Sequence, residues 1–216
     1  PRFSLDLMGT TWAEGNLDAG LKWNAGPSAT SLFGINAYWF NNPLDKNEDG
    51  FIDLTQQKRF SFFNKWQWQR PNEKVAQLAA RYVWEDRWGG ETNWTTADRG
   101  GDEVYGESIY TNRVEILGNY ELPTRLPLFL QASYNFHDQD SYYGDVPYLA
   151  RQEIAFAQMY MDQQWGRHQV LMGAALRYTN YNDNTPATTT ASQTTLPGVF
   201  VQDEITLGEN NHLLMG

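Results

Sequence analysis

Residues 77–85, QLAARYVWE, set the fold because two kinds of side chain alternate along them. The even-numbered positions are apolar or aromatic, and three odd-numbered positions are polar or charged: Gln77, Arg81 and Glu85. A repeat of two residues places one kind of side chain on each face of a β-strand. The segment therefore predicts a strand with one apolar face and one polar face.

The same alternation recurs along the whole chain. It is clearest in residues 113–122 and 128–136. Further strands are predicted at 2–12, 16–24, 30–41, 57–70, 151–164, 167–180, 197–208 and 211–216. Many of these strands reach ten residues, about the length that a tilted strand needs to cross a bilayer, whereas soluble strands average about five or six.

The predicted connections alternate between two lengths. Short turns rich in Pro, Gly and Asn are predicted at 70–73, 122–125, 165–167 and 208–210. Long polar segments are predicted as extracellular loops at 41–56, 86–107, 137–150 and 181–196, the last with a Thr-rich tip at 185–195. Tight turns on one side and long loops on the other are typical of outer-membrane barrels. We therefore predict an all-β, antiparallel up-and-down transmembrane β-barrel, partial, with about ten to eleven strands of a larger barrel.

Composition is compatible with this fold and argues against nucleic acid as a partner. The 216 residues include 9 Trp, 12 Tyr and 11 Phe, and aromatic residues gather near predicted strand ends, where a membrane interface favours them. The mean hydropathy of −0.62 does not argue against a barrel, because barrel strands alternate polar and apolar residues. The net charge of −10, with scattered basic residues, argues against nucleic acid as a partner. A soluble β-sandwich or barrel with an aromatic core is the alternative.

Residues 44–60, LDKNEDGFIDLTQQKRF, resemble the first half of an EF-hand calcium loop. The predicted ligands, with Phe51 offering its carbonyl, are Asp45, Asn47, Asp49, Phe51 and Asp53. Gln56 occupies the closing position, where a bidentate acid is usual. We predict Ca²⁺ in the extracellular loop 41–56 at a partial site. The alternative is a solvated turn that binds no ion.

Two loops combine aromatic rings with charged residues and glycines, which is typical of ligand-contact surfaces. The candidate ligand-binding residues are Trp88, Trp94, Arg99, Tyr105, Tyr142 and Tyr143. The alternative is that the loop around 84–106 packs on itself through its own rings and ion pairs. Signals for catalysis are poor: there is no cysteine, His137, His168 and His212 are isolated in sequence, and no hydrolase or nucleotide-binding motif is present. We predict that the protein is not an enzyme.

Three segments carry a resemblance to a known family: RYVWEDRWGG at 81–90, RGGDEVYGESIYTNRVEILGNYELP at 99–123 and LPGVFVQDEITLGENNHLLMG at 196–216. With these segments the chain resembles the β-barrel of TonB-dependent outer-membrane receptors, and within them the branch for vitamin B12, colicin I or ferric siderophores. The resemblance extends over essentially the whole chain.

The resemblance implies a barrel of 22 strands with a plug domain ahead of it. Residues 1–216 are then expected to be an internal fragment of the barrel domain, with the plug domain and the chain termini absent. It also implies location in the outer membrane of a Gram-negative bacterium and active uptake of a scarce metal-bearing nutrient such as cobalamin, a ferric siderophore or haem. Some members of the vitamin B12 branch use calcium to order extracellular loops.

The partners implied by the resemblance are TonB, through the missing N-terminal plug region, a small metal-chelate ligand, outer-membrane lipid and a surface lipoprotein. Lumen-facing residues would include Arg81, Arg113, Glu115 and Arg177. Two other functions remain open: a passive porin or structural barrel, and a secreted calcium-stabilised protein that binds carbohydrate through aromatic rings.

Overall fold

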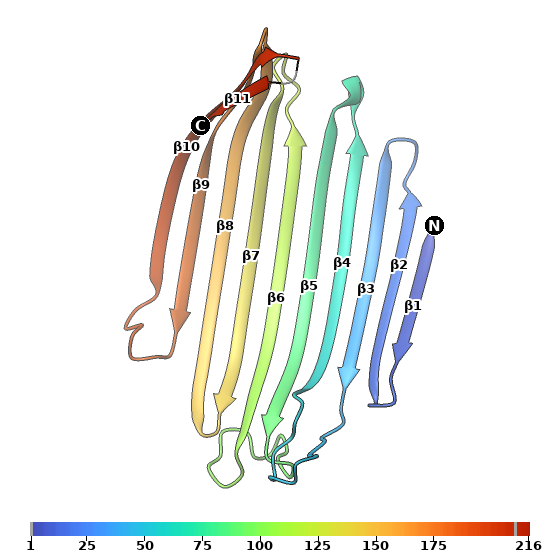
Figure 1. Cartoon of the computed structure of the whole chain (residues 1–216), viewed down its shortest axis with the longest axis vertical. Helices are drawn as coiled ribbons and strands as arrows, with labels where there is room; N and C mark the ends of the chain where they lie inside the picture. Colours follow the sequence, from blue (N-terminus) through green and yellow to red (C-terminus); the bar gives the residue numbers. More distant parts are fainter. Residues whose placement is uncertain (1, 210) are drawn as a thin grey trace.

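The protein is a single antiparallel sheet in which each strand pairs with its neighbours in sequence (Figure 1). The computed structural model describes residues 2–209 and 211–216. The strands are β1 Phe3–Gly9, β2 Glu14–Asn24, β3 Ala29–Phe40, β4 Gln56–Gln69, β5 Val75–Gly90, β6 Gly106–Glu121, β7 Leu128–Tyr143, β8 Val146–Trp165, β9 His168–Asp183, β10 Ser192–Gly208 and β11 Asn211–Met215, with one 3-10 turn, η1, at Pro71–Glu73. The predicted all-β, antiparallel up-and-down barrel fold is confirmed.

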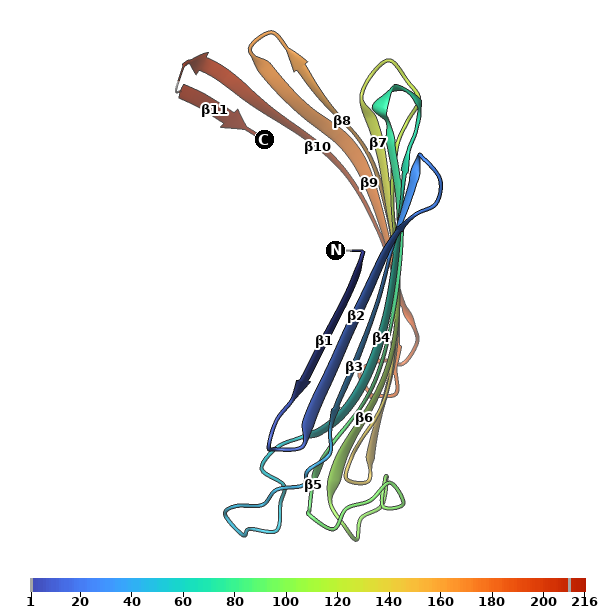
Figure 2. The ribbon, with the colours of Figure 1, turned by 90° about the vertical axis from the view of Figure 1, so that its right-hand side faces the viewer.

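The sheet is one curved layer with a concave side and a convex side (Figure 2). Its order runs from β1 to β11 without a crossover, so β1 and β11 are its two edges within the described residues. No helix among those residues is long and apolar enough to span a membrane. Curvature of this kind comes from the right-handed twist that all β-sheets share.

The connections separate into two ends of the sheet, as predicted. The loop end carries the segments 41–55, 91–105 and 184–191, together with the short β1–β2 and β7–β8 connections. The turn end carries the remaining connections, including η1. Asn210, which belongs to the predicted turn 208–210, lies outside the described residues.

The predicted loop 137–150 is wrong. Residues 137–143 continue β7 and residues 146–150 begin β8, so only Gly144 and Asp145 lie between the strands. Polar sequence does not prevent pairing, because the ladder is made by backbone groups. Gly144 makes the tight turn possible with a φ of 61°, in the left-handed region that glycine enters without strain.

Two other predicted loops are shorter than expected. The segment 86–107 contracts to 91–105, because β5 continues to Gly90. The Thr-rich segment 185–195 is divided: its last residues, from Ser192, pair with β9, with Thr194 opposite Thr179. Threonine is β-branched and favours strands, so composition alone placed the boundary too late.

The long strands leave almost no interior. β5, β6, β7 and β9 have 16 residues each and β8 has 20, so at about 3.3 Å per residue they extend roughly 50–65 Å. Among the described residues the buried apolar side chains are Phe40, Trp94, Ala150 and Met161. Both faces of the sheet therefore depend on their surroundings rather than on a shared core.

Candidate functional site

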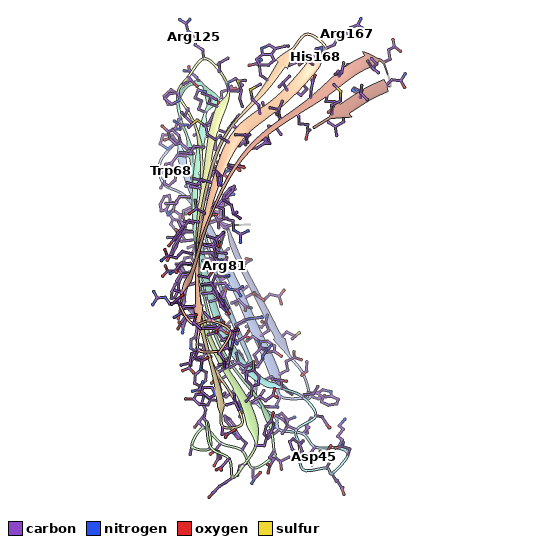
Figure 3. All side chains as sticks on the ribbon, turned by 90° about the vertical axis from the view of Figure 1, so that its left-hand side faces the viewer. Asp45, Trp68, Arg81, Arg125, Arg167 and His168 are labelled. Atoms are coloured by element: carbon purple, nitrogen blue, oxygen red, sulfur yellow. The ribbon has the colours of Figure 1, made fainter. Side chains whose placement is uncertain are left out.

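The two faces of the sheet carry different side chains. Arg81, Glu115 and Asn135 are register partners across β5, β6 and β7, so they share one face. Figure 3 shows Arg81 on the concave side and Trp68, whose register places it on the opposite face, on the convex side. The residues expected to face a lumen all lie on the concave face: Arg81, Arg113, Glu115 and Arg177.

An apolar belt crosses the convex face. It consists of alternate residues of Phe60–Trp68, Ala76–Trp84, Val114–Tyr120, Leu128–Phe136, Ala155–Met161 and Val170–Tyr178. The longer of these stretches extend for roughly 27–30 Å along a strand at about 3.3 Å per residue. The one amide within the belt, Asn64, donates to Ser31 Oγ at 3.0 Å and to the Leu32 carbonyl at 3.2 Å.

Charged and amide side chains replace the apolar ones where the convex face approaches the loop end. They are Lys58, Asp86, Asn112, Asp138, Arg151, Glu153 and Asn182. Arg151 pairs with Glu153 at 3.0 Å. Burial raises the pKa of the Asp86 carboxyl, while the charges of Lys58 and Arg99 act in the opposite direction. The belt therefore has a sharp edge on this side.

Aromatic rings mark the other edge of the belt. Trp23 meets Trp66 edge to face at 5.7 Å between centroids, and Trp66 stacks on Trp68 at 5.8 Å. The Arg70 guanidinium lies 3.9 Å from the centroid of the Tyr120 ring. Rings that combine apolar surface with a polar atom are favoured where an apolar phase meets water.

The two longest loops bend in opposite directions at the loop end. Figure 2 shows the segment 41–55 on the concave side and the light green segment 91–105 on the convex side. At their bases the loops are joined by backbone hydrogen bonds: Ile52 N donates to Gly90 O at 2.9 Å, and Thr92 N donates to Gly50 O at 2.9 Å. The two loops therefore form one connected unit.

Arg99 fixes the loop 91–105 against the convex face. Its guanidinium lies between the rings of Tyr110 and Tyr142, at 4.3 and 4.5 Å from their centroids. Its Nε donates to Ser108 Oγ at 3.0 Å, and one Nη donates to both the carbonyl and the carboxylate of Asp140 at 2.9 and 2.8 Å. These contacts engage Nε and one Nη of Arg99, and its guanidinium contacts two tyrosine rings.

Trp94 strengthens the same attachment. Its ring packs 4.8 Å from that of Trp88, and it is 5% exposed. The ring also covers Gly106, where a Cβ atom would collide with it. Of the six candidate ligand-binding residues, Trp88, Trp94, Arg99 and Tyr142 are thus brought together as packing between loop and strand.

Tyr105 and Tyr143 have a different position, beside the concave face. Tyr105 donates to Glu107 at 2.9 Å, and Glu107 is the register partner of Tyr143. The Tyr105 ring lies 6.3 Å from that of Phe51, and the hydrogen bond to Glu107 raises the pKa of the Tyr105 phenol. Phe51, Tyr105 and Tyr143 are 44%, 42% and 37% exposed. We call these three residues the aromatic mouth.

A chain of hydrogen bonds joins β8, β9 and the segment 184–191 at the loop end. Tyr148 and Tyr181 share a hydrogen bond of 3.0 Å, and Tyr181 donates to Asp183 at 2.7 Å. Thr185 donates to the same carboxylate from its backbone and its hydroxyl, at 2.8 and 2.6 Å. These bonds, those of Thr185 and Tyr181 above all, lower the pKa of Asp183 to about 2.

The acidic loop 41–55 is folded on its own hydrogen bonds. Asp45 accepts from the backbone N–H groups of Asp49 and Gly50 at 3.2 and 2.9 Å, and Asp49 accepts from Asn47 and from the backbone of Phe51, both at 2.9 Å. Asp53 accepts from the Lys46 backbone at 2.9 Å. Within residues 2–209 and 211–216, no three His, Cys, Asp or Glu side chains gather as a metal-ligand cluster.

Gln56 does not point toward those carboxylates. It is 1% exposed, its carbonyl accepts from Asn42 N, and its amide donates to the carbonyls of Asn42 and Leu54 at 3.1 and 2.8 Å. An amide both donates and accepts, so it can join the two ends of the loop where a carboxylate could only accept. The sequence pattern, which puts Gln56 at the closing position of a calcium loop, does not reveal this contact.

The three histidines that are isolated in sequence each contact a polar or charged side chain in the fold. His137 Nδ1 lies 3.3 Å from Arg113, His168 Nδ1 lies 2.7 Å from Asp203, and His212 Nδ1 lies 3.2 Å from Glu204. Asp203 and Glu204 belong to opposite faces of β10, as their register predicts. Strand pairing makes these contacts, over 24 and 35 residues for His137 and His168 and across the β10–β11 hairpin for His212.

Comparison with known proteins shows a similar fold in a solved structure. No family model matches the sequence, and no curated protein matches it. The solved structure of "Copper transporter OprC" is similar over 91% of this chain, with a TM-score of 0.57 and 14% sequence identity. The chain covers 34% of that protein, about a third of its length. At this identity the likeness shows the fold, the wall of a β-barrel, and neither the branch nor the cargo.

We predict that Arg99→Lys releases the loop 91–105 from the convex face. Lysine keeps the charge but cannot stack between two rings while donating to Ser108 and Asp140. Amide hydrogen exchange in 91–105 should rise roughly ten- to a hundredfold, because the lost contacts contribute about 1–3 kcal/mol. Arg87→Lys, at an exposed position of β5, is the control and should leave exchange unchanged. Equal exchange in both variants would contradict the attachment.

Proposed function

We propose that the chain forms part of the wall of an outer-membrane receptor in a Gram-negative bacterium, which takes up a metal-bearing nutrient with energy delivered through TonB. The observation that carries the proposal is the apolar belt on the convex face of a sheet that buries only a few apolar side chains. Its extent fits the band of about 25 Å by which barrels contact lipid once strand tilt is included. The likeness to a copper transporter barrel supports the same class.

The position of the long loops supports a receptor rather than a bare wall. At about 3.3 Å per residue, β6 and β7 continue roughly 25 Å beyond the belt, and the aromatic mouth lies at their ends beside the loop 41–55. We propose that Tyr105, Tyr143 and Phe51 contact a small metal chelate, since exposed rings give large rigid contact area. Trp88, Trp94, Arg99 and Tyr142 hold the adjoining loop in place. Cobalamin, a ferric siderophore, haem and a copper complex are the cargo candidates.

The same substitution at two neighbouring positions on opposite faces of the sheet tests whether the convex face contacts lipid. Ile116 and Leu117 are adjacent on β6 and 42% and 50% exposed, but Ile116 lies in the belt and Leu117 on the concave face. Ile116→Lys should reduce the free energy of unfolding from lipid vesicles by about 2–4 kcal/mol, because the charge would enter hydrocarbon. Leu117→Lys should cost less than about 1 kcal/mol, measured by urea titration. Similar losses for both variants would refute a lipid-facing convex side.

We also propose that the loop 41–55 binds Ca²⁺ weakly through Asp45, Asn47, Asp49, the Phe51 carbonyl and Asp53. Calorimetric titration should give a dissociation constant of about 0.1–1 mM, as for extracellular calcium modules. Asp49→Ala should abolish the heat, and Asp138→Ala, on the convex face, should not. Gln56→Glu should not tighten binding, because Gln56 is directed at the Asn42 backbone. An unaltered protein that gives no heat would eliminate the site.

Growth separates coupled uptake from a passive pore. A strain that lacks the complete gene should grow poorly when one of the four cargo candidates is limiting, and the restored gene should recover growth only when TonB is present. Restoration without TonB would favour a porin. Unchanged growth on all four would reject the cargo list.

A further inference from the structure

A hollow of about 480 Å³ lies on the concave wall where β4, β5 and β6 are adjacent. Arginine side chains dominate its lining: Arg59, Arg81 and Arg113, joined by Glu85 and His137. Hydroxyl and amide groups of Asn36, Ser61 and Thr111 complete the polar surface. In a chain whose net charge is −10, this concentration of guanidinium groups requires an explanation.

The carboxylates near the hollow are already engaged. Glu115 lies 2.8 Å from Arg81 and also accepts from Asn135 at 3.2 Å. Glu85 accepts from the neutral amide of Gln57 at 2.7 Å. Within residues 2–209 and 211–216, neither Arg59 nor Arg113 forms an ion pair. Glu85 keeps its charge and is the register partner of Arg59, so the three arginines exceed Glu85 and Glu115 by about one positive charge. The hollow is therefore positive overall, with two guanidinium groups that form no ion pair.

Both of these guanidinium groups are held in place by neutral partners. The Arg113 Nε and one Nη lie 3.3 Å from His137 Nδ1, which accepts when the imidazole carries its proton on Nε2. The Arg59 guanidinium lies 5.5 Å from the centroid of the Tyr38 ring, and Tyr38 donates to Glu14 at 3.0 Å. An arginine that is oriented by a neutral group keeps donors for a planar oxyanion.

We propose that Arg59 and Arg113 form a binding site for an oxyanion, a carboxylate or phosphate group, on the solute that enters from the loop end. This inference rests on the proposed function and names the chemistry of its ligand. Glu107 at the aromatic mouth and Arg113 are on the same strand and the same face, about 20 Å apart along β6. A solute that leaves the mouth reaches the arginines next.

The charge at the mouth restricts the ligand further. Acidic residues outnumber basic ones in both 41–55 and 91–105, so a bare anion is repelled there. A complex in which oxyanion groups surround a metal cation has its charge shielded at entry and still presents oxygen atoms to the arginines. The ligand class is therefore a metal chelate with carboxylate or phosphate oxygens at its periphery.

Calorimetric titration of the protein purified in detergent tests the site with defined probes. Citrate and orthophosphate separate carboxylate from phosphate recognition, and trimethyl citrate has the citrate skeleton without its charge. We expect citrate or phosphate to bind and trimethyl citrate not to bind. Arg59→Gln and Arg113→Gln should each weaken binding roughly tenfold or more, because a charge-assisted hydrogen bond is lost. Arg113→Lys should be intermediate.

Arg125→Gln is the matched control. Arg125 is an exposed arginine at the turn end, far from Arg81 and the hollow (Figure 3), so its loss should leave binding unchanged. Migration of the unheated variants on a denaturing gel confirms that each barrel is folded. Binding that ignores Arg59 and Arg113, or that is equal for trimethyl citrate, would overturn the site.

The outcome is separable from that of the growth experiment. Oxyanion binding that depends on the two arginines, combined with unchanged growth, would leave the site intact and reject the uptake function. TonB-dependent growth without oxyanion binding would do the reverse.

Discussion

The antiparallel backbone ladder is the constraint on which the rest of the structure depends. It satisfies the backbone hydrogen bonds of β3 to β9 on both sides along most of their length, and it forces successive side chains to opposite faces. Because the described residues form a single layer, neither face of the sheet is covered by a second layer of this chain. The protein therefore needs two different surroundings, one apolar and one aqueous, and the alternation beginning with QLAARYVWE assigns a side chain to each.

Side-chain contacts, and not the backbone ladder, decide to which side of the sheet each long loop turns. Trp94 and Arg99 draw the loop 91–105 to the convex side, and Gly106 leaves the space in which the Trp94 ring lies. The loop 41–55 turns the other way, where Lys46 lies 4.0 Å from the centroid of the Trp12 ring. Together they leave the aromatic mouth open toward the concave face.

Much of the fold could be predicted from the sequence because the repeat of two residues reports both strands and faces. Arg81 and Trp84 were placed on opposite sides by parity alone. The prediction of a loop at 137–150 is wrong because polarity does not exclude strand pairing: β7 continues beyond the apolar belt with polar residues on both faces. A glycine at 144 was the available signal for a tight turn.

The candidate site was less predictable, for a physical reason. The spacing of Asp45, Asp49 and Asp53 is local and visible in the sequence. The contact between Arg99 and Asp140, by contrast, joins residues 41 positions apart and depends on the register of β6 with β7. The direction of Gln56 depends equally on where Asn42 comes to lie. Residue types identify the chemistry available, and strand register decides which groups meet.

The concave wall shows how the two surroundings must differ. Arg81 and Glu115 form a cross-strand ion pair, so their opposite charges compensate each other. In the part of the chain that the structure describes, Arg59 and Arg113 form no ion pair, and an unpaired guanidinium is costly away from water or an anion. Along their strands, these two arginines lie level with the loop-end edge of the apolar belt on the other face of the sheet. A wall that is one sheet thick thus separates an apolar face from a polar face with excess positive charge. Under the proposed function, the concave side would be the route for a polar solute.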